Sequence, residues 1–324
     1  MKAVRVHEVG GPEVLKVEDV EVPVPGAGEA LIRHTVIGVN FIDTYFRSGL
    51  YKAPTPLPFT PGSEGAGVVE AIGPGVSEVA VGDRVVYAGS VGAYAEYRTM
   101  PADRLVPIPD NVDDRTAAAV LLKGLTAQFL VTQTFKVEPH HRVLFHAAAG
   151  GVGLIAGQWL KSIGATTIGT VGSPDKVELA RQAGYTHIVD YRAEDFVSRV
   201  AEITGGEKCD VVYDSVGKDT FPASLDCLRM RGLFVSFGNS SGAVPPFEMI
   251  LLSQKGSLFA TRPTLFHYFA KREDLLAGAA DLFDKVAKGI VTVEIGQEFA
   301  LDDVVGCHQA LASRSTRGST ILIP

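Results

Sequence analysis

The stretch from Val143 to Val171 constrains the fold of this chain more than any other. An apolar run ending at Phe145 leads into Ala148-x-Gly150-x-x-Gly153, and apolar residues then recur with helical spacing as far as Ile163. Gly164 follows, where a left-handed helix end is expected, and the run from Thr166 to Val171 is rich in β-branched residues. This order of strand, glycine turn, helix and strand predicts a βαβ unit.

The glycines of this turn point to a dinucleotide. They let the backbone turn tightly and approach a pyrophosphate, whose charge then meets the unpaired amides at the helix N-terminus. A side chain at Gly151 or Gly153 would fill that space. The alternative is a glycine turn that serves only to pack helix against strand, but the order of the flanking elements favours nucleotide binding.

The end of the second strand indicates which dinucleotide binds. NAD sites usually carry an acidic residue about 20 residues after the glycines, which accepts from the ribose 2′-hydroxyl. Here Gly172 and Ser173 occupy that place, so no carboxylate repels a 2′-phosphate, and Ser173 can donate to one. Lys176 supplies a cation. The alternative is that Lys176 is only a solvated surface lysine, but a cation in the first turn of a helix opposes the helix dipole, and a bound anion would relieve this cost. Asp175 is an acidic residue beside the predicted 2′-phosphate site, and its expected role is to compensate the dipole of the helix that follows. We therefore expect NADPH rather than NADH.

Composition limits the remaining possibilities. A length of 324 residues favours two domains, and a hydrophobic fraction of 46% is ample for packed cores. The net charge of −7 gives no basic footprint for nucleic acid, and no apolar run reaches the roughly 18 residues needed to cross a bilayer. The chain start lacks the pattern of a secretory signal, and three widely spaced cysteines argue for a reducing cytosol. We expect no nucleic-acid partner, no membrane partner and a cytoplasmic location.

The first 110 residues predict a compact, mostly antiparallel barrel or sandwich. Residues 55–62 contain three prolines and a glycine and must form a loop. A helical pattern from Asp113 to Phe135 is interrupted at Gly124, where we expect two helices to separate and the linker between domains to lie. The β-like runs are Lys2–His7, Leu15–Val20, Glu29–Val39, Gly65–Ile72, Arg84–Tyr87 and Tyr94–Thr99.

After the βαβ unit, strands alternate with helices, which predicts an open, parallel, doubly wound sheet. Ser173 is the expected N-cap of a helix from Pro174 to Ala183, and the last strand, Ser319–Ile323, has no sheet of its own. We expect that strand to return to the first domain, with the site in a cleft between the two domains. The expected strands are His187–Asp190, Asp210–Tyr213, Leu233–Phe237 and Ser257–Thr261, and the expected helices are Phe196–Ile203, Thr220–Leu228, Arg272–Lys288 and Leu301–Ala312.

Five segments together carry a family resemblance. They are GVNFIDTY at 38–45, GSEGAG at 62–67, the glycine turn at 147–153, FGNSSG at 237–242 and the closing residues 318–324. The chain resembles, over essentially its whole length, the quinone oxidoreductases, which form the zeta-crystallin-like branch of the medium-chain dehydrogenase/reductase superfamily. The resemblance implies an α/β protein with a GroES-like, mostly-β barrel domain at 1–122, a doubly wound parallel-sheet (Rossmann) domain at 123–262, and a return to the first domain at 263–324. It also implies a homodimer joined through the Rossmann sheet edges.

Two residues separate this chain from the zinc alcohol dehydrogenases of the same superfamily. Those enzymes hold catalytic zinc with a cysteine and a histidine at the places where Asn40 and Ser63 stand here. Neither is a competent zinc ligand, and a structural zinc site would need four cysteines. The histidines, including His34 and His308, have no ligand spacing and are expected to be surface or satisfied core residues. We expect no metal.

The resemblance implies a set of site residues. Each of three residues also has an interpretation without a functional role. Asn40 could be a turn residue, Tyr51 a half-exposed aromatic residue and Arg314 a solvated residue at a helix end. Relatives often carry tyrosine where Phe129 stands, so a hydroxyl contact is lost there. The substrate pocket is expected to contain Asn40, Tyr45 and Tyr51, and the cofactor is expected to contact Phe41, Tyr45, Thr126, Phe129, Gly150, Gly151, Val152, Gly172, Ser173, Lys176, Tyr191, Phe237, Gly238, Ser240 and Arg314.

Without a metal, an unactivated ketone is a poor substrate because no Lewis acid stabilises the developing alkoxide. A quinone or conjugated enone spreads that charge over a π system, so orientation against the nicotinamide can supply most of the catalysis. Three hypotheses stay open: an NADPH:quinone reductase, an NADPH-dependent reductase of α,β-unsaturated aldehydes or ketones, and a protein that binds NADPH without turnover. We expect the first.

Overall fold

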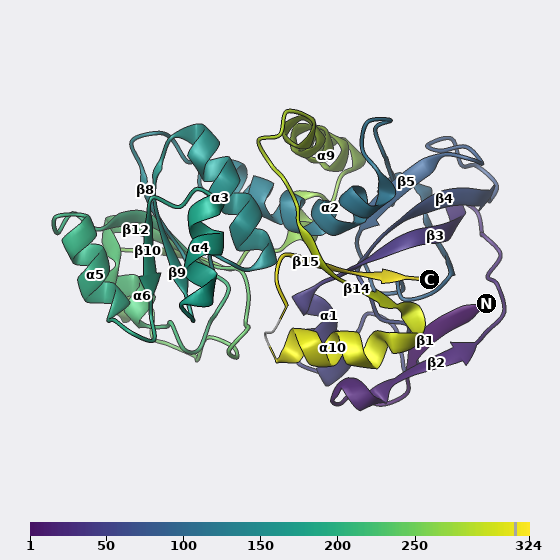
Figure 1. The fold of residues 1–324 in the computed structure, drawn as a ribbon, viewed down its shortest axis with the longest axis horizontal. Coiled ribbons are helices and arrows are strands. Elements are labelled where there is room, and N and C mark those ends of the chain that lie inside the picture. Colours follow the sequence, from purple (N-terminus) through teal and green to yellow (C-terminus); the bar gives the residue numbers. More distant parts are fainter. Residues whose placement is uncertain (314–315) are drawn as a thin grey trace. The chain divides into compact units, whose positions relative to one another are not determined.

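The computed structural model describes residues 1–313 and 316–324, which cluster into two compact units (Figure 1). Unit 1 comprises Met1–Lys123, Phe269–Ala287 and Val293–Pro324, and unit 2 comprises Gly124–Tyr268 and Lys288–Thr292. The break between the units therefore falls inside a helix, at Lys123 and Gly124.

Unit 2 contains the predicted parallel sheet. Its strands follow the order β10-β9-β8-β11-β12-β13, and every adjacent pair is parallel. The doubly wound topology expected from the sequence is confirmed. The strands are β8 (Arg142–Phe145), β9 (Thr166–Val171), β10 (His187–Asp190), β11 (Cys209–Asp214), β12 (Leu228–Ser236) and β13 (Phe259–Thr261).

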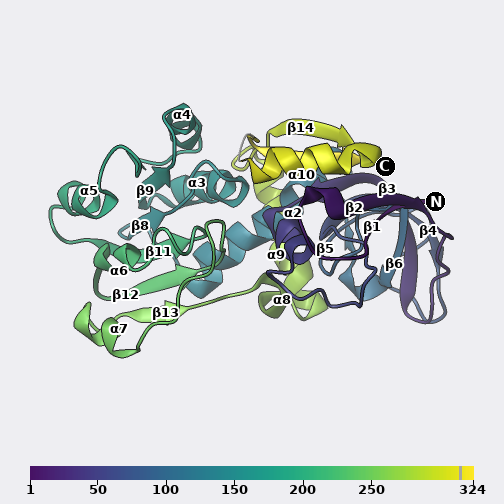
Figure 2. The same cartoon turned by 90° about the horizontal axis from the view of Figure 1, so that it is seen from below.

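Helices cover both faces of this sheet. Helices α3 and α4 contact each other on one face, and α5 and α6 contact each other on the other face (Figures 1 and 2). Buried apolar residues of the strands, among them Leu144, Ile168 and Val212, form the core beneath α5 and α6. The helices of unit 2 are α3 (Gly151–Ile163), α4 (Asp175–Gln182), α5 (Phe196–Ile203), α6 (Ala223–Asp226), α7 (Ile250–Gln254) and α8 (Leu265–Tyr268).

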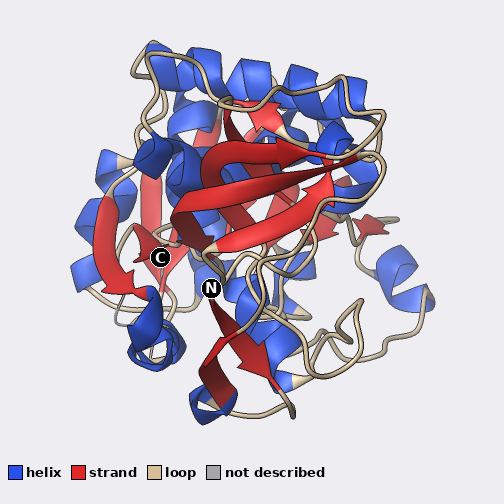
Figure 3. Ribbon diagram, turned by 90° about the vertical axis from the view of Figure 1, so that its right-hand side faces the viewer, coloured by secondary structure: helices blue, strands red, loops and turns tan. Residues whose placement is uncertain are grey.

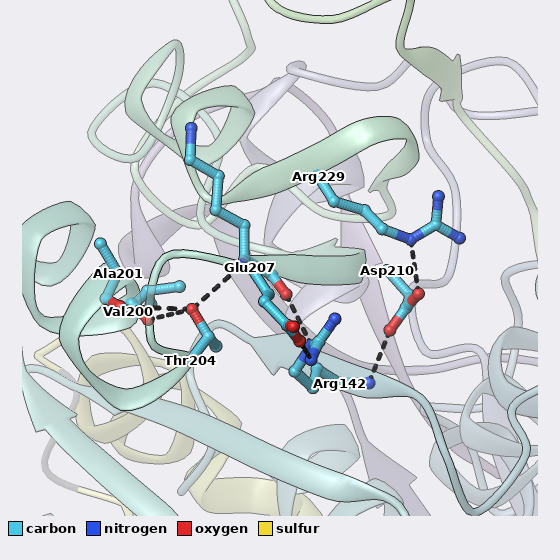
Figure 4. A network of polar contacts seen from close by, with 8 residues as sticks. Arg142, Val200, Ala201, Thr204, Glu207, Asp210 and Arg229 are labelled. Atoms are coloured by element: carbon cyan, nitrogen blue, oxygen red, sulfur yellow. Dashed lines mark hydrogen bonds and ion pairs between the residues drawn. The ribbon is translucent and has the colours of Figure 1, made fainter.

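The amino ends of β8 and β11 are joined by side-chain contacts (Figure 4). Asp210 accepts from the backbone N–H of Arg142 at 2.7 Å and from Nε of Arg229 at 2.6 Å. The Arg142 side chain donates to the carbonyl oxygen of Lys208 and pairs with Glu207. Each charged side chain in this group has a partner of opposite charge, so these side chains hold the amino edge of the sheet together.

Unit 1 is built on a mostly antiparallel sheet in which β14-β15-β3-β4-β5-β7 are neighbours and β6 also pairs with β3. Figure 3 looks onto this unit and shows its strands together with both chain termini. A separate hairpin-like pair joins β1 and β2. The strands are β1 (Lys2–Val6), β2 (Leu15–Asp19), β3 (Glu29–Val39), β4 (Glu64–Ile72), β5 (Arg84–Ala88), β6 (Tyr97–Pro101), β7 (Val106–Pro107), β14 (Ile295–Ala300) and β15 (Ser319–Ile323).

The C-terminal strand joins the N-terminal sheet, as predicted. β15 pairs antiparallel with β3, with Ile321 opposite Gly38, and parallel with β14, which the sequence analysis did not anticipate. Two helices of this segment cover the unit: α9 (Arg272–Ala287) and α10 (Val304–Ala312), the latter entered through a short 3-10 turn at Leu301–Asp303. Among the described residues, no helix has the length and apolar character required to cross a membrane.

Two local predictions were wrong. Residues Phe41–Ser48 form a helix, α1, within a region expected to be β-like. Gly124 does not divide the following helix, because α2 runs without a break from Asp114 to Phe129 and continues as a π-helical turn over Leu130–Thr134. Glycine costs a helix roughly 1 kcal/mol, but here its neighbours Leu121 and Leu125 are fully buried, and packing prevails.

The start of α4 also differs from expectation. The helix begins at Asp175 with Pro174 in the capping position, and no side chain caps it. Ser173 instead accepts from the backbone N–H of Lys176 through its carbonyl oxygen, at 3.1 Å. A proline is suited to a helix start because its fixed φ is already helical, so it moves the boundary one residue along the chain.

Candidate functional site

The strand order of unit 2 fixes where a ligand can bind in it. From β8 the chain builds outward through β9 to β10, and then returns to place β11 on the other side of β8. The loops that follow β8 and β11 therefore leave the sheet in opposite directions. In such sheets a crevice opens at this reversal, beyond the carboxyl ends of the strands.

The loop after β8 is a backbone cradle. Ala147 adopts a left-handed conformation with φ of 55°, which is uncommon for a residue other than glycine and marks local strain. A Cβ on Gly153 would lie 2.4 Å from the carbonyl oxygen of Ala147 and 2.7 Å from that of Ala148. Helix α3 starts at Gly151, and no side chain caps its first turn. Close backbone approach and uncapped amides are what a pyrophosphate needs, so these residues fit a dinucleotide.

The loops after β9 and β10 bring two predicted cofactor residues together. A Cβ on Gly172 would lie 2.4 Å from the hydroxyl oxygen of Tyr191, so the tyrosine covers this glycine closely. Ser173 and Lys176 follow at the same edge of the sheet, both half-buried. Gly172, Ser173 and Lys176 thus follow the end of β9, and Tyr191 from the loop after β10 lies against the first of them.

The loops after β11 and β12 are tied to each other. Ser240 donates its backbone N–H to the carbonyl oxygen of Ser215 at 3.0 Å, and a Cβ on Gly238 would lie 2.7 Å from that same oxygen. The ring of Phe237 lies 5.5 Å from that of Phe145 at the end of β8. The predicted residues Phe237, Gly238 and Ser240 therefore share the carboxyl edge of the sheet with the glycine turn.

Asp214 organises this edge and was not among the predicted site residues. Its carboxylate is fully buried and accepts from two backbone amides, those of Val216 and Gly217, and from the hydroxyls of Thr220 and Ser224. Four donors on one carboxylate hold the loop after β11 in a single conformation. The signal in the sequence was an acidic residue directly after the apolar run 211–213.

Thr126 and Phe129 lie one turn apart in the part of α2 that belongs to unit 2. Phe129 is 1% exposed and stacks on Tyr268, with ring centroids 4.4 Å apart and an interplanar angle of 18°. The hydroxyl of Tyr268 accepts from Thr134 at 2.8 Å. A tyrosine ring from α8 therefore lies against Phe129, the position at which relatives were expected to carry a tyrosine.

In unit 1, the predicted substrate residues are gathered around α1. Asn40 precedes the helix, and the rings of Phe41, Tyr45 and Tyr51 form a chain of edge contacts with centroids 5.7 and 5.0 Å apart. Tyr51 also donates its backbone N–H to the carbonyl oxygen of Tyr45 at 3.0 Å. The structure therefore brings all four residues together. Arg314 lies outside the described residues.

A buried ion pair lies beside Asn40. Glu64 is fully buried, and its Oε2 accepts from Nδ2 of Asn40 at 2.7 Å and lies 3.4 Å from Nζ of Lys123. Its other oxygen, Oε1, accepts from the backbone N–H of Leu122 at 2.6 Å. Neither Glu64 nor Lys123 was among the predicted site residues. Lys123 is the single charge in an otherwise apolar helical stretch, and because buried charges need partners, that pattern could have pointed to a buried acidic residue.

A second buried network starts from Asp43 in α1. Ser63 donates to its Oδ1 at 2.8 Å, while the backbone N–H of Asn40 and the hydroxyl of Tyr94 donate to its Oδ2 at 2.9 and 3.0 Å. The hydroxyl of Tyr94 lies 3.1 Å from Nε2 of His308. Asn40 and Ser63, which stand where zinc dehydrogenases have ligands, are thus both held by carboxylates.

The proton positions in this network follow from the donors. Arg47 can only donate, so Nδ1 of His308, at 3.1 Å, must accept, and the single imidazole proton lies on Nε2, which donates to Tyr94. Burial and the neighbouring guanidinium lower the pKa of His308 to about 3, so the ring is neutral. Burial raises the pKa of Asp43 to about 6, against the hydrogen bonds that it accepts. The arrangement is a one-way chain of donors from Arg47 to Asp43.

Among residues 1–313 and 316–324, no cluster of three histidine, cysteine or acidic side chains has the arrangement of a metal site. The three cysteines are buried free thiols. His34 and His308 are buried and hydrogen-bonded on both ring nitrogens, which confirms their interpretation as satisfied core residues.

Comparison with known families places both units. The family model described as "Alcohol dehydrogenase GroES-like domain" matches residues 26–110, and the model described as "Zinc-binding dehydrogenase" matches residues 151–285. The first match lies within unit 1 and the second covers most of the parallel sheet of unit 2. Both parts of the predicted fold class are confirmed.

Individual relatives match along the whole chain. A protein of Pseudomonas aeruginosa named quinone oxidoreductase is 52% identical over all of this chain and 99% of its own length. The crystal structure of Escherichia coli quinone oxidoreductase complexed with NADPH superimposes with a TM-score of 0.98 at 47% identity, covering 100% of both chains. A Burkholderia protein named 2-haloacrylate reductase is 44% identical over 98% of each chain.

The buried histidines predict how stability depends on pH. An unfolded histidine has a pKa near 6.5, whereas that of folded His308 is about 3, so the free energy of unfolding falls as the pH drops from 6.5 toward 3. We expect His308→Gln to reduce this slope by about 1.4 kcal/mol per pH unit, measured by urea unfolding between pH 4 and 6. Asp43, whose pKa is raised, contributes a slope of opposite sign in both proteins.

The matched control is His34→Gln, because burial lowers the pKa of that histidine to about 3 as well. Both variants should flatten the curve to a similar extent. A His308→Gln curve parallel to that of the wild type would show that the folded imidazole takes up a proton in this range.

Proposed function

The chain belongs to the quinone oxidoreductase family of the medium-chain dehydrogenase/reductase superfamily, and we propose that it catalyses the NADPH-dependent reduction of quinones. The observation that carries this proposal is the carboxyl edge of the unit 2 sheet. At that edge, glycines form a close backbone cradle, and no acidic residue stands at the expected 2′-phosphate position. The chain is also about one half identical, along its full length, to named quinone oxidoreductases.

The proposed cofactor residues divide by the part of NADPH that they would hold. The turn at Gly150, Gly151 and Val152 would take the pyrophosphate, because the uncapped amides of α3 favour negative charge. Bound NADPH supplies a hydride from its nicotinamide. Gly172, Ser173 and Lys176 would take the 2′-phosphate, Tyr191 the adenine side, Phe237, Gly238 and Ser240 the nicotinamide ribose and amide, and Phe41, Tyr45, Thr126, Phe129 and Arg314 further parts of the cofactor.

Asn40, Tyr45 and Tyr51 are the proposed substrate residues. Their grouping around α1 and the burial of Asn40 and Tyr45 support a pre-formed, largely apolar surface with a few polar groups. We propose that the reaction needs no zinc, although one matching family model is described as zinc-binding. At the places of two superfamily zinc ligands, Asn40 and Ser63 bind Glu64 and Asp43 instead.

A second candidate function has its own support. The relative named 2-haloacrylate reductase, at 44% identity over nearly the whole chain, carries a name for the reduction of a conjugated carbon–carbon double bond. Such a substrate also delocalises the charge that develops during hydride transfer. The alternative is therefore an NADPH-dependent reductase of α,β-unsaturated carbonyl compounds on the same residues.

Steady-state oxidation of NADPH with matched panels of quinones and α,β-unsaturated carbonyls tests the proposal. We expect quinones to give the higher kcat/KM, and prolonged treatment with a chelator to leave the rate unchanged. Higher kcat/KM for the unsaturated carbonyls would establish the second candidate in place of the first. Tight NADPH binding with neither class reduced would make the protein a non-catalytic NADPH binder.

Lys176 tests the choice of cofactor. We expect Lys176→Ala to raise the KM for NADPH about tenfold and to leave that for NADH nearly unchanged, because a hydrogen bond to a charged group contributes about 1.5–3 kcal/mol and only NADPH has the 2′-phosphate. The matched control is Lys161→Ala, which removes an exposed lysine at the other end of α3. Equal losses with both nucleotides would contradict the assignment.

We also propose a homodimer in a reducing cytosol. Among the described strands, β13 pairs only with β12, which leaves a sheet edge open (Figure 2). The two strands at this edge carry exposed apolar side chains: Phe259 in β13 is 61% exposed and Met230 in β12 is 76% exposed. Open edges and apolar patches are sites of self-association, and β13 of a second copy would extend the sheet. The buried free thiols support the reducing location.

Sedimentation equilibrium tests the dimer. The wild type should sediment at twice its chain mass of 34.4 kDa, and the double variant Phe259→Lys with Met230→Lys at the chain mass, because charges on an edge oppose pairing. Val24→Lys is the control, since Val24 is 86% exposed and belongs to unit 1. A dimer that survives the double variant would rule out this edge.

A further inference from the structure

The ammonium group of Lys123 has fewer partners than its burial demands. The residue is 7% exposed, and the described contact of its Nζ is with Glu64 at 3.4 Å. Charge-assisted N–H···O bonds are usually near 2.7–2.9 Å, so this contact is long. An ammonium carries three N–H donors, and a buried one is stable only when acceptors meet them.

Glu64, in contrast, is saturated. Besides Lys123, it accepts from the side chain of Asn40 at 2.7 Å and from the backbone of Leu122 at 2.6 Å. A Cβ on Gly38 would lie 2.5 Å from Oε2 of Glu64 and 2.2 Å from the carbonyl oxygen of Ala118, so the carboxylate is also held by close packing. The cluster therefore has donors in excess, and the excess lies on Lys123.

The donors in excess on Lys123 are of the kind that the proposed reaction needs. Hydride transfer to a quinone or conjugated carbonyl adds one hydrogen with two electrons and leaves a negative charge on the substrate oxygen. That oxygen must be stabilised while the charge develops and must then receive a proton. Lys123 shares Glu64 with Asn40, one of the proposed substrate residues, so both donors are fixed by the same carboxylate.

We propose that Lys123 is a catalytic residue that donates to the carbonyl oxygen of the substrate, with Glu64 as its positioning residue. This inference rests on the proposed function. In the step, the substrate accepts a hydride from the bound nicotinamide, the Nζ–H bond of Lys123 breaks, and an O–H bond forms on the substrate oxygen. Lys123 is left neutral and regains its proton from water after the product leaves, so the net reaction consumes one NADPH and one proton.

The test needs variants that still fold, because removing Lys123 alone leaves Glu64 buried without its counter-ion. The double variant Lys123→Met with Glu64→Gln removes both charges and keeps the two side-chain lengths. Lys123→Arg keeps the charge. The thermal midpoint and the Kd for NADPH of each variant are measured first, and both are expected to stay close to the wild-type values.

A phenol serves as the probe, because its ionised form resembles the reduced substrate. In the presence of NADP⁺, 4-nitrophenol is titrated against pH, and its visible absorbance reports the ionised fraction of the bound probe. We expect the wild type to bind the phenolate at least tenfold more tightly than the phenol, and the double variant to lose this preference. Lys123→Arg should retain most of it. No binding of the probe, equal binding of its two forms by the wild type, or an unchanged preference in the double variant would overturn the proposal.

Kinetics supply the second readout. We expect kcat for quinone reduction to fall at least tenfold in the double variant, with the KM for NADPH unchanged. An unchanged kcat would overturn the role of Lys123. If the wild type reduces no quinone but still prefers the phenolate tenfold through Lys123, the proposed substrate class fails while the donor site stands.

Discussion

Buried carboxylates need donors, and this requirement shapes both units. Asp43, Glu64 and Asp214 are all fully buried, and each is surrounded by backbone amides, hydroxyls or an amide side chain. An unsatisfied carboxylate at such a place would be far more costly than any single apolar contact, so the neighbouring segments adopt the conformations that supply donors. Donation to these carboxylates fixes the start of α1, the side-chain amide of Asn40 and the loop after β11. These are also the segments that carry the candidate site.

The two edges of the parallel sheet in unit 2 are built on different principles. At the amino edge, Asp210 pairs with Arg229 and the side chain of Arg142 pairs with Glu207, so side-chain charges close the structure there. At the carboxyl edge, glycines bring the backbone close, as at Gly153 and Gly172, and α3 begins without a capping side chain. Side-chain charges are thus consumed where no ligand is expected, and backbone donors remain where an anionic ligand is expected.

At the two positions where zinc dehydrogenases of the superfamily carry ligands, unit 1 has side chains engaged in hydrogen bonds. Asn40 and Ser63 are held by Glu64 and Asp43, and Asp43 continues through Tyr94 and His308 to Arg47. Such a network keeps side chains in fixed positions, whereas a Lewis acid would polarise the substrate. The arrangement suits acceptors that already delocalise charge, which agrees with the names of the relatives that match along the full chain.

Local patterns in the sequence determined the βαβ unit, the parallel sheet, the bounds of α5 and the return of the last strand, because periodicity, caps and glycines act over a few residues. They also indicated α2 but misplaced a break at Gly124, since burial of its neighbours outweighs the propensity of one glycine. The pairing of Glu64 with Lys123, 59 residues apart, and of Arg47 with His308, 261 residues apart, was decided by tertiary structure alone. The sequence shows which residues are polar or charged; only the folded chain, by removing water, decides which of these groups must meet.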